Sequence, residues 1–302
     1  MKDLSKNIVV PINFSEDTNN SLEEAVFLAK KLDSKIHLIN IIEITDWWNN
    51  LVLSKEVKSK LLSLSEEKLQ NIASQYHDIE FETNVLFGRI HEQILHYSES
   101  VNAELIVLCD KHRKDKENKI LGSIVTHVIT ESKIPVITIK NKIDSEISNI
   151  IVPIDLSDDT DSQIKSAIAF NKDCDATLHF VSVLFQSYRN RNRRIRLKAK
   201  HLERKLNDLD IKFTMNLIKK SKAYAYKDIL EFSEKNNSDL IIIMTHKEKF
   251  SFDNYIGAFA HHIINYSKAP IMTITSQAVN SESGSFVNRF IDPLGIFEEN
   301  KE

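Results

Sequence analysis

The histidines and cysteines are the side chains of this sequence best suited to metal binding or nucleophilic chemistry. His261 and His262 are adjacent and His96 follows His91 by five residues, yet neither pair has a cysteine or carboxylate at ligand spacing. Cys109 stands in no motif that would activate a thiol. The sequence also lacks the Gly-x-Ser-x-Gly elbow, the His-Glu-x-x-His helix and the Walker loop. These patterns predict structural histidines and no metal site, and they do not require an enzyme.

An arginine-rich segment follows residue 188. This segment could bind phosphate or an acidic partner, because guanidinium groups bind oxyanions well. The corresponding segment of the first half, Trp47 to Asn50, is not basic, and no aromatic residues alternate with the arginines. We therefore favour a solvated surface arm at the start of a long helix, containing Arg189, Arg191, Arg193, Arg194 and Arg196. Trp47 and Trp48 are adjacent and cannot both enter one core, which leaves an interface or a pocket for one of them.

The chain repeats its own sequence. Asn7 to Thr18 reads NIVVPINFSEDT and returns 142 positions later as NIIVPIDLSDDT, and Ala103 to Leu108 is echoed 135 positions later. A repeat of about 140 residues is too long for a solenoid and matches one compact domain, so the sequence indicates a tandem duplication. The expected units are two repeats and a tail, at 1–142, 147–276 and 277–302.

The composition is that of an ordinary globular protein, with 42% hydrophobic and 27% charged residues among 302. A net charge of -3 gives no bulk reason to expect nucleic acid or an anionic membrane as a partner. The two cysteines fall in different repeats and fit a reducing compartment. The sequence opens without an apolar signal region, and no apolar run approaches about 18 residues. A cytoplasmic protein is the expectation.

Strand and helix patterns alternate through each repeat. In the first, runs rich in β-branched residues predict buried strands at 8–12, 35–42, 79–87, 105–108 and 135–139. Helical patterns separate them, including a long helix over Lys55 to Tyr76 whose apolar residues are Val57, Leu61, Leu64, Leu69 and Ile72. This order predicts an α/β fold of two tandem, doubly wound, parallel five-stranded sheets with helices on both faces. Ligands bind such sheets outside the carboxyl ends of the strands, here after Ile12, after Leu108 and ahead of Gly122.

Four features of the sequence resemble the universal stress protein family. They are the Val-x-Pro-Ile-[Asp/Asn] opening, the Ile-Val-Leu fourth strand, the helix start Leu121-Gly122-Ser123-Ile124-Val125 and the closing Ile134-Pro135-Val136-Ile137. The resemblance covers about 5–140 and 147–275. It implies pairing through the fifth strands, Pro135 to Ile139 and Pro270 to Ile274, so that the chain contains its own dimer with a pseudo-twofold axis.

The ATP-binding members of that family carry a Gly-x-x-Gly-(nine residues)-Gly-[Ser/Thr] stretch around the phosphates and an Asp after the first strand. Glycine lets the backbone approach an anion, and free amides at a helix N-terminus attract it. The first repeat keeps Gly122 and Ser123 but has Cys109, His112 and Asn13 at the other positions. The second repeat keeps Asp155, Thr245, His246 and Gly257 but has Met244, Lys247 and Ala258 at the others. Both signatures are incomplete, in complementary ways.

Two interpretations of these positions stay open. In one, Gly122 and Gly257 only let the last helix pack closely on the sheet, while Asn13 and Asp155 only cap a loop. In the other, a remodelled pocket still holds ATP, another adenine nucleotide or another anion, with Lys247 binding phosphate as a point charge. In the first repeat, His112-Arg113-Lys114 offers similar chemistry. We expect any anion site in the second repeat, because only that repeat keeps the Asp.

The residues after 276 have no counterpart in the first repeat. Ser281 to Ser285 reads as a linker, and many large apolar residues follow around Asp292-Pro293. Such residues are costly in water, so we expect the tail to dock on its own body or on a partner chain. A disordered tail is the alternative.

The sequence thus predicts a non-catalytic binding or stress-response regulatory module with a degenerate nucleotide pocket. One alternative is a weak nucleotide-hydrolysing protein that uses Asp155 and the loop 244–257, and another is a structural interaction protein. The expected partners are the chain itself, as an intramolecular pseudo-dimer or a homodimer, and a protein of unknown identity. Neither nucleic acid nor a membrane is expected.

Overall fold

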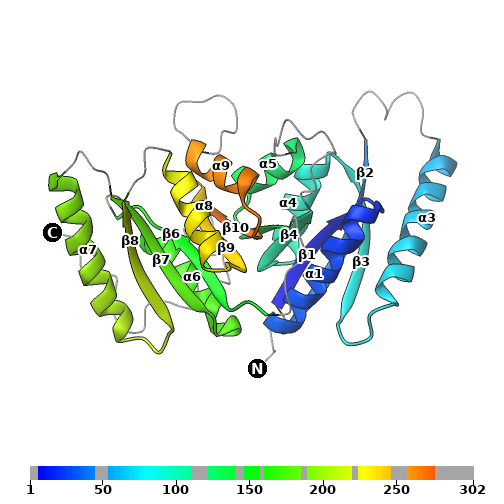
Figure 1. Ribbon diagram of the computed structural model, residues 1–302. Coiled ribbons are helices and arrows are strands. Elements are labelled where there is room, and N and C mark those ends of the chain that lie inside the picture. The colour runs from blue at the N-terminus through cyan, green and yellow to red at the C-terminus, as the bar shows by residue number, and fades with distance from the viewer. Residues whose placement is uncertain are drawn as a thin grey trace.

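The structure, a computed structural model, describes residues 6–44, 54–109, 122–139, 146–156, 160–184, 189–219, 224–245 and 257–275. Strands and helices alternate through both halves of the chain, as the sequence patterns predict (Figure 1). Repeat one contains β1 (Lys6–Ile12), α1 (Glu16–Leu32), β2 (Ser34–Glu43), α3 (Lys55–Ala73), β3 (Phe81–Gly88), α4 (Ile90–Ser100), β4 (Leu105–Cys109), α5 (Ser123–Glu131) and β5 (Val136–Ile139). Repeat two contains β6 (Asn149–Pro153), α6 (Asp161–Cys174), β7 (Thr177–Leu184), α7 (Arg189–Asn207), β8 (Phe213–Lys219), α8 (Ala225–Lys235), β9 (Leu240–Thr245), α9 (Ala258–Tyr266) and β10 (Ile271–Thr275).

The strands of both repeats form a single sheet with the order β3-β2-β1-β4-β5-β10-β9-β6-β7-β8. Each half is a parallel, doubly wound five-stranded sheet, and the equivalent strands of the second half follow in the reverse order across the sheet. The halves join where β5 and β10 pair antiparallel, with Met272 opposite Ile137. Thr138 and Thr273 strengthen this junction, because each hydroxyl donates to a backbone carbonyl of the other strand. The predicted fold and the predicted pairing of the fifth strands are therefore confirmed.

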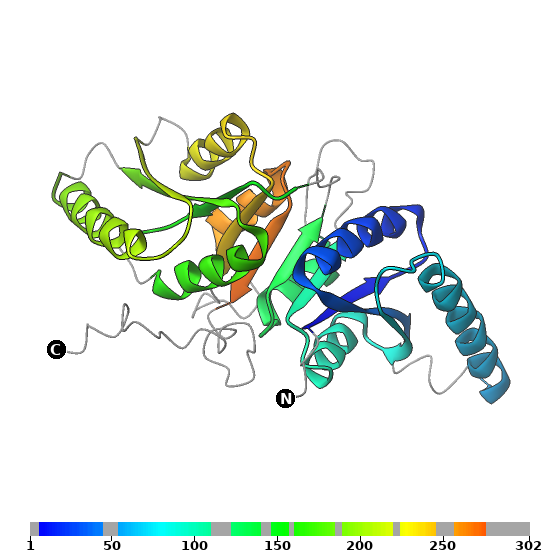
Figure 2. The ribbon, with the colours of Figure 1, turned by 90° about the horizontal axis from the view of Figure 1, so that it is seen from below.

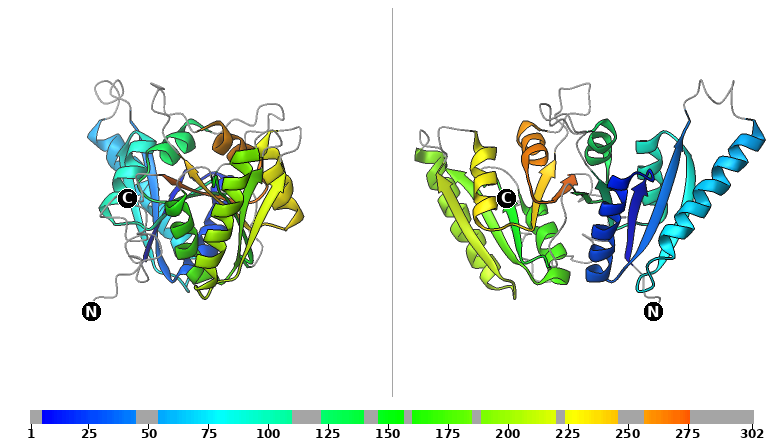
Figure 3. Two further views of the ribbon diagram at one scale, coloured as in Figure 1. Left: turned by 90° about the vertical axis from the view of Figure 1, so that its left-hand side faces the viewer. Right: turned by 45° about the vertical axis from the view of Figure 1, so that its right-hand side comes forward.

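Helices cover both faces of this sheet, and each face has one apolar cluster that continues from repeat one into repeat two. Ile8 and Val10 of β1 face the layer of α1, α3, α6 and α7, and Val9 faces the layer of α4, α5, α8 and α9. This alternation follows from the period of two in a strand. Figures 2 and 3 show the two halves meeting at the centre, with α3 and α7 at the outer ends. A salt bridge of 2.7 Å between Lys6 and Asp173 also links the repeats.

The long helix of repeat one differs from its prediction in extent and in its buried face. It ends at Ala73, not at Tyr76. Leu69 is buried, but Val57, Leu61 and Leu64 are 44%, 36% and 46% exposed. At 3.6 residues per turn these three point roughly 80° to 140° away from Leu69 around the helix, so they cannot face the sheet with it. The helix therefore carries a second apolar stripe that the sequence pattern merges with the first.

Other predictions fall outside the described residues or stay untested. Trp47, Trp48 and the predicted docking tail, 277–302, lie outside the described ranges. The predicted unit boundaries stay predictions. In the part of the chain that the structure describes, no helix is long and apolar enough to cross a membrane.

Candidate functional site

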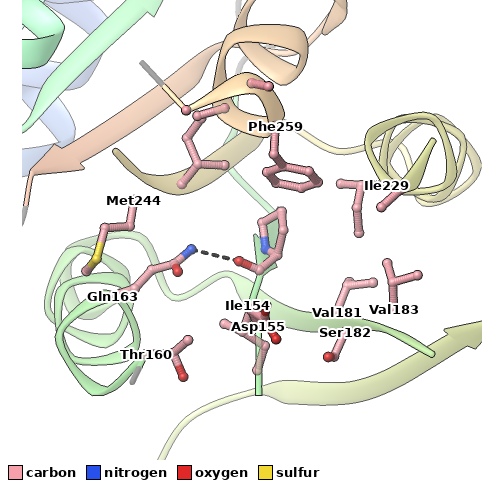
Figure 4. Close-up of a pocket in the computed structure, with 16 residues that line it drawn as sticks. Ile154, Asp155, Thr160, Gln163, Val181, Ser182, Val183, Ile229, Met244 and Phe259 are labelled. Atoms are coloured by element: carbon pink, nitrogen blue, oxygen red, sulfur yellow. Dashed lines mark hydrogen bonds between the residues drawn. The ribbon is translucent and has the colours of Figure 1, made fainter. Parts of the chain in front are cut away.

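A pocket of about 490 Å³ opens at the carboxyl ends of β6, β7 and β9 in repeat two (Figure 4). It lies where β6 has β9 on one side and β7 on the other, the place at which a doubly wound sheet forms a crevice. β6 and β9 pair only at Ile150 with Leu240 and Ile151 with Ile241. Its lining residues are Pro153, Ile154, Asp155, Thr160, Gln163, Val181, Ser182, Val183, Ala225, Ile229, Ile243, Met244, Gly257, Ala258, Phe259 and Ala260.

Two helices begin at the edge of this pocket. Ala225 is the first residue of α8 and Ala258 the first of α9, and both line the cavity. The N-cap residues, Tyr224 and Gly257, make no side-chain capping hydrogen bond. The first N–H groups of a helix have no partner within the helix and carry partial positive charge. The pocket therefore combines apolar walls with a rim that attracts anions.

The structure brings together four of the seven residues predicted for repeat two. Asp155, Met244, Gly257 and Ala258 all line the pocket. Thr245 does not: it is the buried last residue of β9, and its hydroxyl donates to the Ile274 carbonyl at 3.5 Å. His246 and Lys247 lie outside the described residues. Whether these residues bind a ligand stays a prediction.

The corresponding residues of repeat one are placed differently. Asn13 is exposed, and its side-chain oxygen accepts a hydrogen bond from the Ser15 N–H at 3.1 Å, which fits the loop-capping interpretation. Cys109 ends β4, while Gly122 and Ser123 are exposed at the start of α5. His112 lies outside the described residues.

Neither Gly122 nor Gly257 is needed for packing. A Cβ atom added at either position would meet no atom of the described residues within 4 Å. Their φ values of -61° and -48° are also open to any L-residue. Gly88 is different, since its φ is +141° and a Cβ there would lie 2.9 Å from the Gln93 amide nitrogen. The close-packing interpretation of Gly122 and Gly257 is therefore wrong, and Gly257 leaves open space beside the pocket.

Several proteins to which this chain is similar are universal stress proteins. The model of the universal stress protein family matches residues 5–140. Two universal stress proteins of Methanocaldococcus jannaschii are 26% and 22% identical to the chain over 147 and 160 residues, which are 46% and 47% of this chain and 84% and 99% of theirs. Residues 5–140 of this chain form a domain of the universal stress protein family.

The family's fold extends over both repeats. The crystal structure of a universal stress protein from Archaeoglobus fulgidus DSM 4304 is similar to 91% of this chain and 99% of its own, with a TM-score of 0.68 and 20% identity. At that identity the likeness shows the fold alone. It agrees with the tandem organisation that the internal repeat predicts.

The arginine-rich segment of the chain forms the first turns of α7. Arg193, Arg194 and Arg196 are exposed, as a solvated surface predicts. Arg191 differs, because its guanidinium lies 3.4 Å from the Asp155 carboxylate at the pocket. The arginine side chain is 39% and the aspartate 58% exposed. An arginine from the surface helix therefore offsets part of the negative charge that Asp155 brings to the pocket.

Sequence reasoning missed several residues of the pocket. Gln163, Ser182, Ile229 and Phe259 line it together with the predicted positions. Gln163 left a signal: it lies at helical spacing from Ala167 and Phe170, which are both fully buried. A polar side chain in an apolar stripe needs a hydrogen-bonding reason. The other three gave no such signal, because apolar or small residues are ordinary in strands and helices of this kind.

One histidine of each predicted pair stacks on another aromatic ring. His91 stacks on His127, with ring centroids 4.5 Å apart, and His262 stacks on Tyr226 at 4.3 Å. Burial and the neighbouring His262 lower the pKa of His261. Across the described residues, no three metal-binding side chains gather closely enough to hold an ion.

Proposed function

We propose that this universal stress protein is a binding and regulatory module whose ligand site is the repeat-two pocket. The ligand class is a small molecule with an apolar ring system and an anionic group, and adenine nucleotides such as ATP are the first compounds to test. The observation that carries the proposal is the convergence of Asp155, Met244, Gly257 and Ala258 on one cavity below the N-terminus of α9. Residues about ninety positions apart in the chain therefore meet at one place. Close packing against the described residues does not require a glycine at position 257.

The chemistry of the lining supports binding in preference to catalysis. Among the pocket residues that the structure describes, Asp155 alone is ionisable, and it already contacts Arg191. General acid–base catalysis needs a titratable side chain free to exchange a proton with the substrate, and no second ionisable group stands beside Asp155 in the described lining. The apolar walls and the two helix N-termini provide affinity instead. Lys247, in this proposal, contributes on the phosphate side.

A pair of glycine variants tests the location of the site. Gly257→Val adds a side chain where the structure has open space, so it should leave the fold intact and weaken ATP binding by about tenfold or more, since a ligand and the valine would occupy the same volume. Gly122→Val makes the same change in repeat one and should leave the affinity unchanged. Isothermal titration calorimetry of the full chain with ATP and magnesium measures both.

The outcome also decides between the repeats. Binding that survives Gly257→Val but is lost in Gly122→Val would move the site to repeat one, and an absence of binding in the parent protein would reject the nucleotide class. Asp155→Ala and Lys247→Ala should each weaken binding by about 1 to 3 kcal/mol if a charge-assisted hydrogen bond is lost.

A further inference from the structure

Gln163 holds a fixed amide in the pocket. The residue is 4% exposed and lies in the first turn of α6. Its nitrogen donates to the Pro153 carbonyl at 2.9 Å and to the Ile242 carbonyl at 3.0 Å. These carbonyls belong to β6 and β9, beyond the last residues at which the two strands pair. The amide therefore bridges the two strands at the point where the pocket opens (Figure 4).

This bridge determines which end of the amide is left for a ligand. Backbone carbonyls only accept hydrogen bonds, so both hydrogens of the Gln163 amide are used by these two bonds. A flip of the amide by 180° would place its oxygen next to two carbonyl oxygens, which repel it. The side chain makes no other hydrogen bond with the residues that the structure describes. Its oxygen consequently keeps its capacity to accept a hydrogen bond, on a residue that lines the pocket.

Ser182 places a second buried polar group in the same cavity. It is 2% exposed, lines the pocket from β7, and its hydroxyl makes no hydrogen bond within the described part of the chain. The hydroxyl can donate or accept, whereas Gln163 can only accept. The surrounding walls are apolar, including Val181, Ile229 and Phe259.

We propose that Gln163 is the specificity-determining residue of the pocket, selecting ligands that present an N–H or O–H donor to its oxygen. The inference rests on the proposed function and names the chemistry that the ligand must carry. For a purine nucleotide, the donor is either an amino group of the base or a hydroxyl of the sugar. An oxo group in place of the amino group sets one acceptor against another, which a buried site rejects strongly. Ser182 completes the polar contact from the side of β7.

Calorimetric titration of the full chain with ATP, ITP and 2′-deoxy-ATP tests the assignment. The parent protein should bind ATP at least about threefold to tenfold more tightly than the analogue that lacks the donor, as expected for one neutral hydrogen bond. Weaker binding of ITP identifies the base amine, and weaker binding of 2′-deoxy-ATP identifies the sugar hydroxyl. Gln163→Met should remove the discrimination, and Ser182→Ala should reduce ATP binding without disturbing the strand bridge.

Asn171→Leu is the matched control. Asn171 is an equally buried amide on the same helix, but both ends of its amide bond to Ala176, away from the pocket. The control should be less stable than the parent yet discriminate among the nucleotides as the parent does. Equal binding of all three nucleotides by the parent overturns the role of Gln163 and leaves the proposed function standing. Unchanged discrimination in Gln163→Met makes the residue a strand bridge only, and no binding of any nucleotide overturns both proposals.

Discussion

Each repeat buries a histidine at the same place in its second strand, and the two repeats surround it differently. His37 pairs with Glu82 of β3, whereas His179 pairs with Thr214 of β8. His37 bonds to the Tyr97 hydroxyl through Nδ1, at 3.1 Å, and its buried Nε2 has no partner among the described residues. Both ring nitrogens of His179 are bonded, to Thr214 at 2.8 Å and to Asn149 at 3.1 Å. The same strand position thus accommodates a buried histidine with different hydrogen-bond partners in the two repeats.

The first-strand loops differ in the same way. In repeat one, Asn13 turns back to bond the Ser15 N–H, so its side chain serves the loop itself. In repeat two, Asp155 lies at the pocket and contacts Arg191 of α7. At the same backbone position, the side chain therefore bonds within its own loop in repeat one and contacts another helix in repeat two. This difference supports placing ligand binding in repeat two.

The largest effect is expected in the core that the two repeats share. Phe170 of α6 and Leu28 of α1 occupy equivalent positions and are almost fully buried in the same apolar cluster. Phe170→Ala should lower the free energy of unfolding by about 3 to 5 kcal/mol and Leu28→Ala by about 2 to 5 kcal/mol, because each leaves a cavity. Since the cluster continues through both repeats, either change should shift one cooperative transition. Differential scanning calorimetry that resolves two separate transitions would show that the repeats unfold independently.

An intermediate effect is expected on the pH dependence of stability. Burial lowers the pKa of His37, with the Glu82 carboxylate opposing the shift, and burial also lowers the pKa of His179. A histidine whose pKa is lower in the folded state contributes stability that is present above its unfolded pKa, about 6.5, and lost as the pH falls below it. Each such group can change the unfolding free energy by up to about 1.4 kcal/mol per pH unit.

Gln substitutions compare the two histidines. His37→Gln and His179→Gln should each lessen the loss of stability between pH 7 and pH 5. The larger change is expected for His37, because its charged ring holds a buried Nε2–H without an acceptor among the described residues, while the charged ring of His179 can donate to Asn149 from Nε2 and to the Thr214 hydroxyl from Nδ1. Glu82 faces Nδ1, at 4.0 Å, and so does not serve Nε2. Urea unfolding at a series of pH values measures this, and a steeper acid slope in His37→Gln than in the parent would contradict it.

The smallest effect is expected for the ion pair at the pocket. Arg191→Ala should cost less than about 1 kcal/mol of stability, because both side chains are partly exposed and screened by solvent. Arg194→Ala, an exposed arginine on the same helix, is the control and should be close to neutral. Urea unfolding at low and high salt should show the Arg191 contribution fading as the salt concentration rises. A contribution independent of salt would mean that Arg191 stabilises α7 by packing.

The sequence by itself determined the architecture of this protein. Its internal repeat and β-branched runs gave two units of alternating strands and helices, and the buried face of α1, with Leu22, Ala25 and Leu32, matches the spacing read from the sequence. Such patterns are local consequences of the periods 2 and 3.6, so they can be read without the fold. The loops that hold Asp155 and Gly257 could be named because doubly wound sheets bind ligands at one edge.

Only the tertiary structure decided what each of those residues faces. The turn of Thr245 toward β10, the reach of Arg191 to Asp155 and the bridge that Gln163 makes between β6 and β9 all join segments far apart in the chain. The exposure of Val57, Leu61 and Leu64 on α3 was also decided by the tertiary structure, because the face of the helix that is buried is the one that packs on the sheet. A sequence period reports which residues share a face, but the direction of that face depends on packing partners supplied by the rest of the fold.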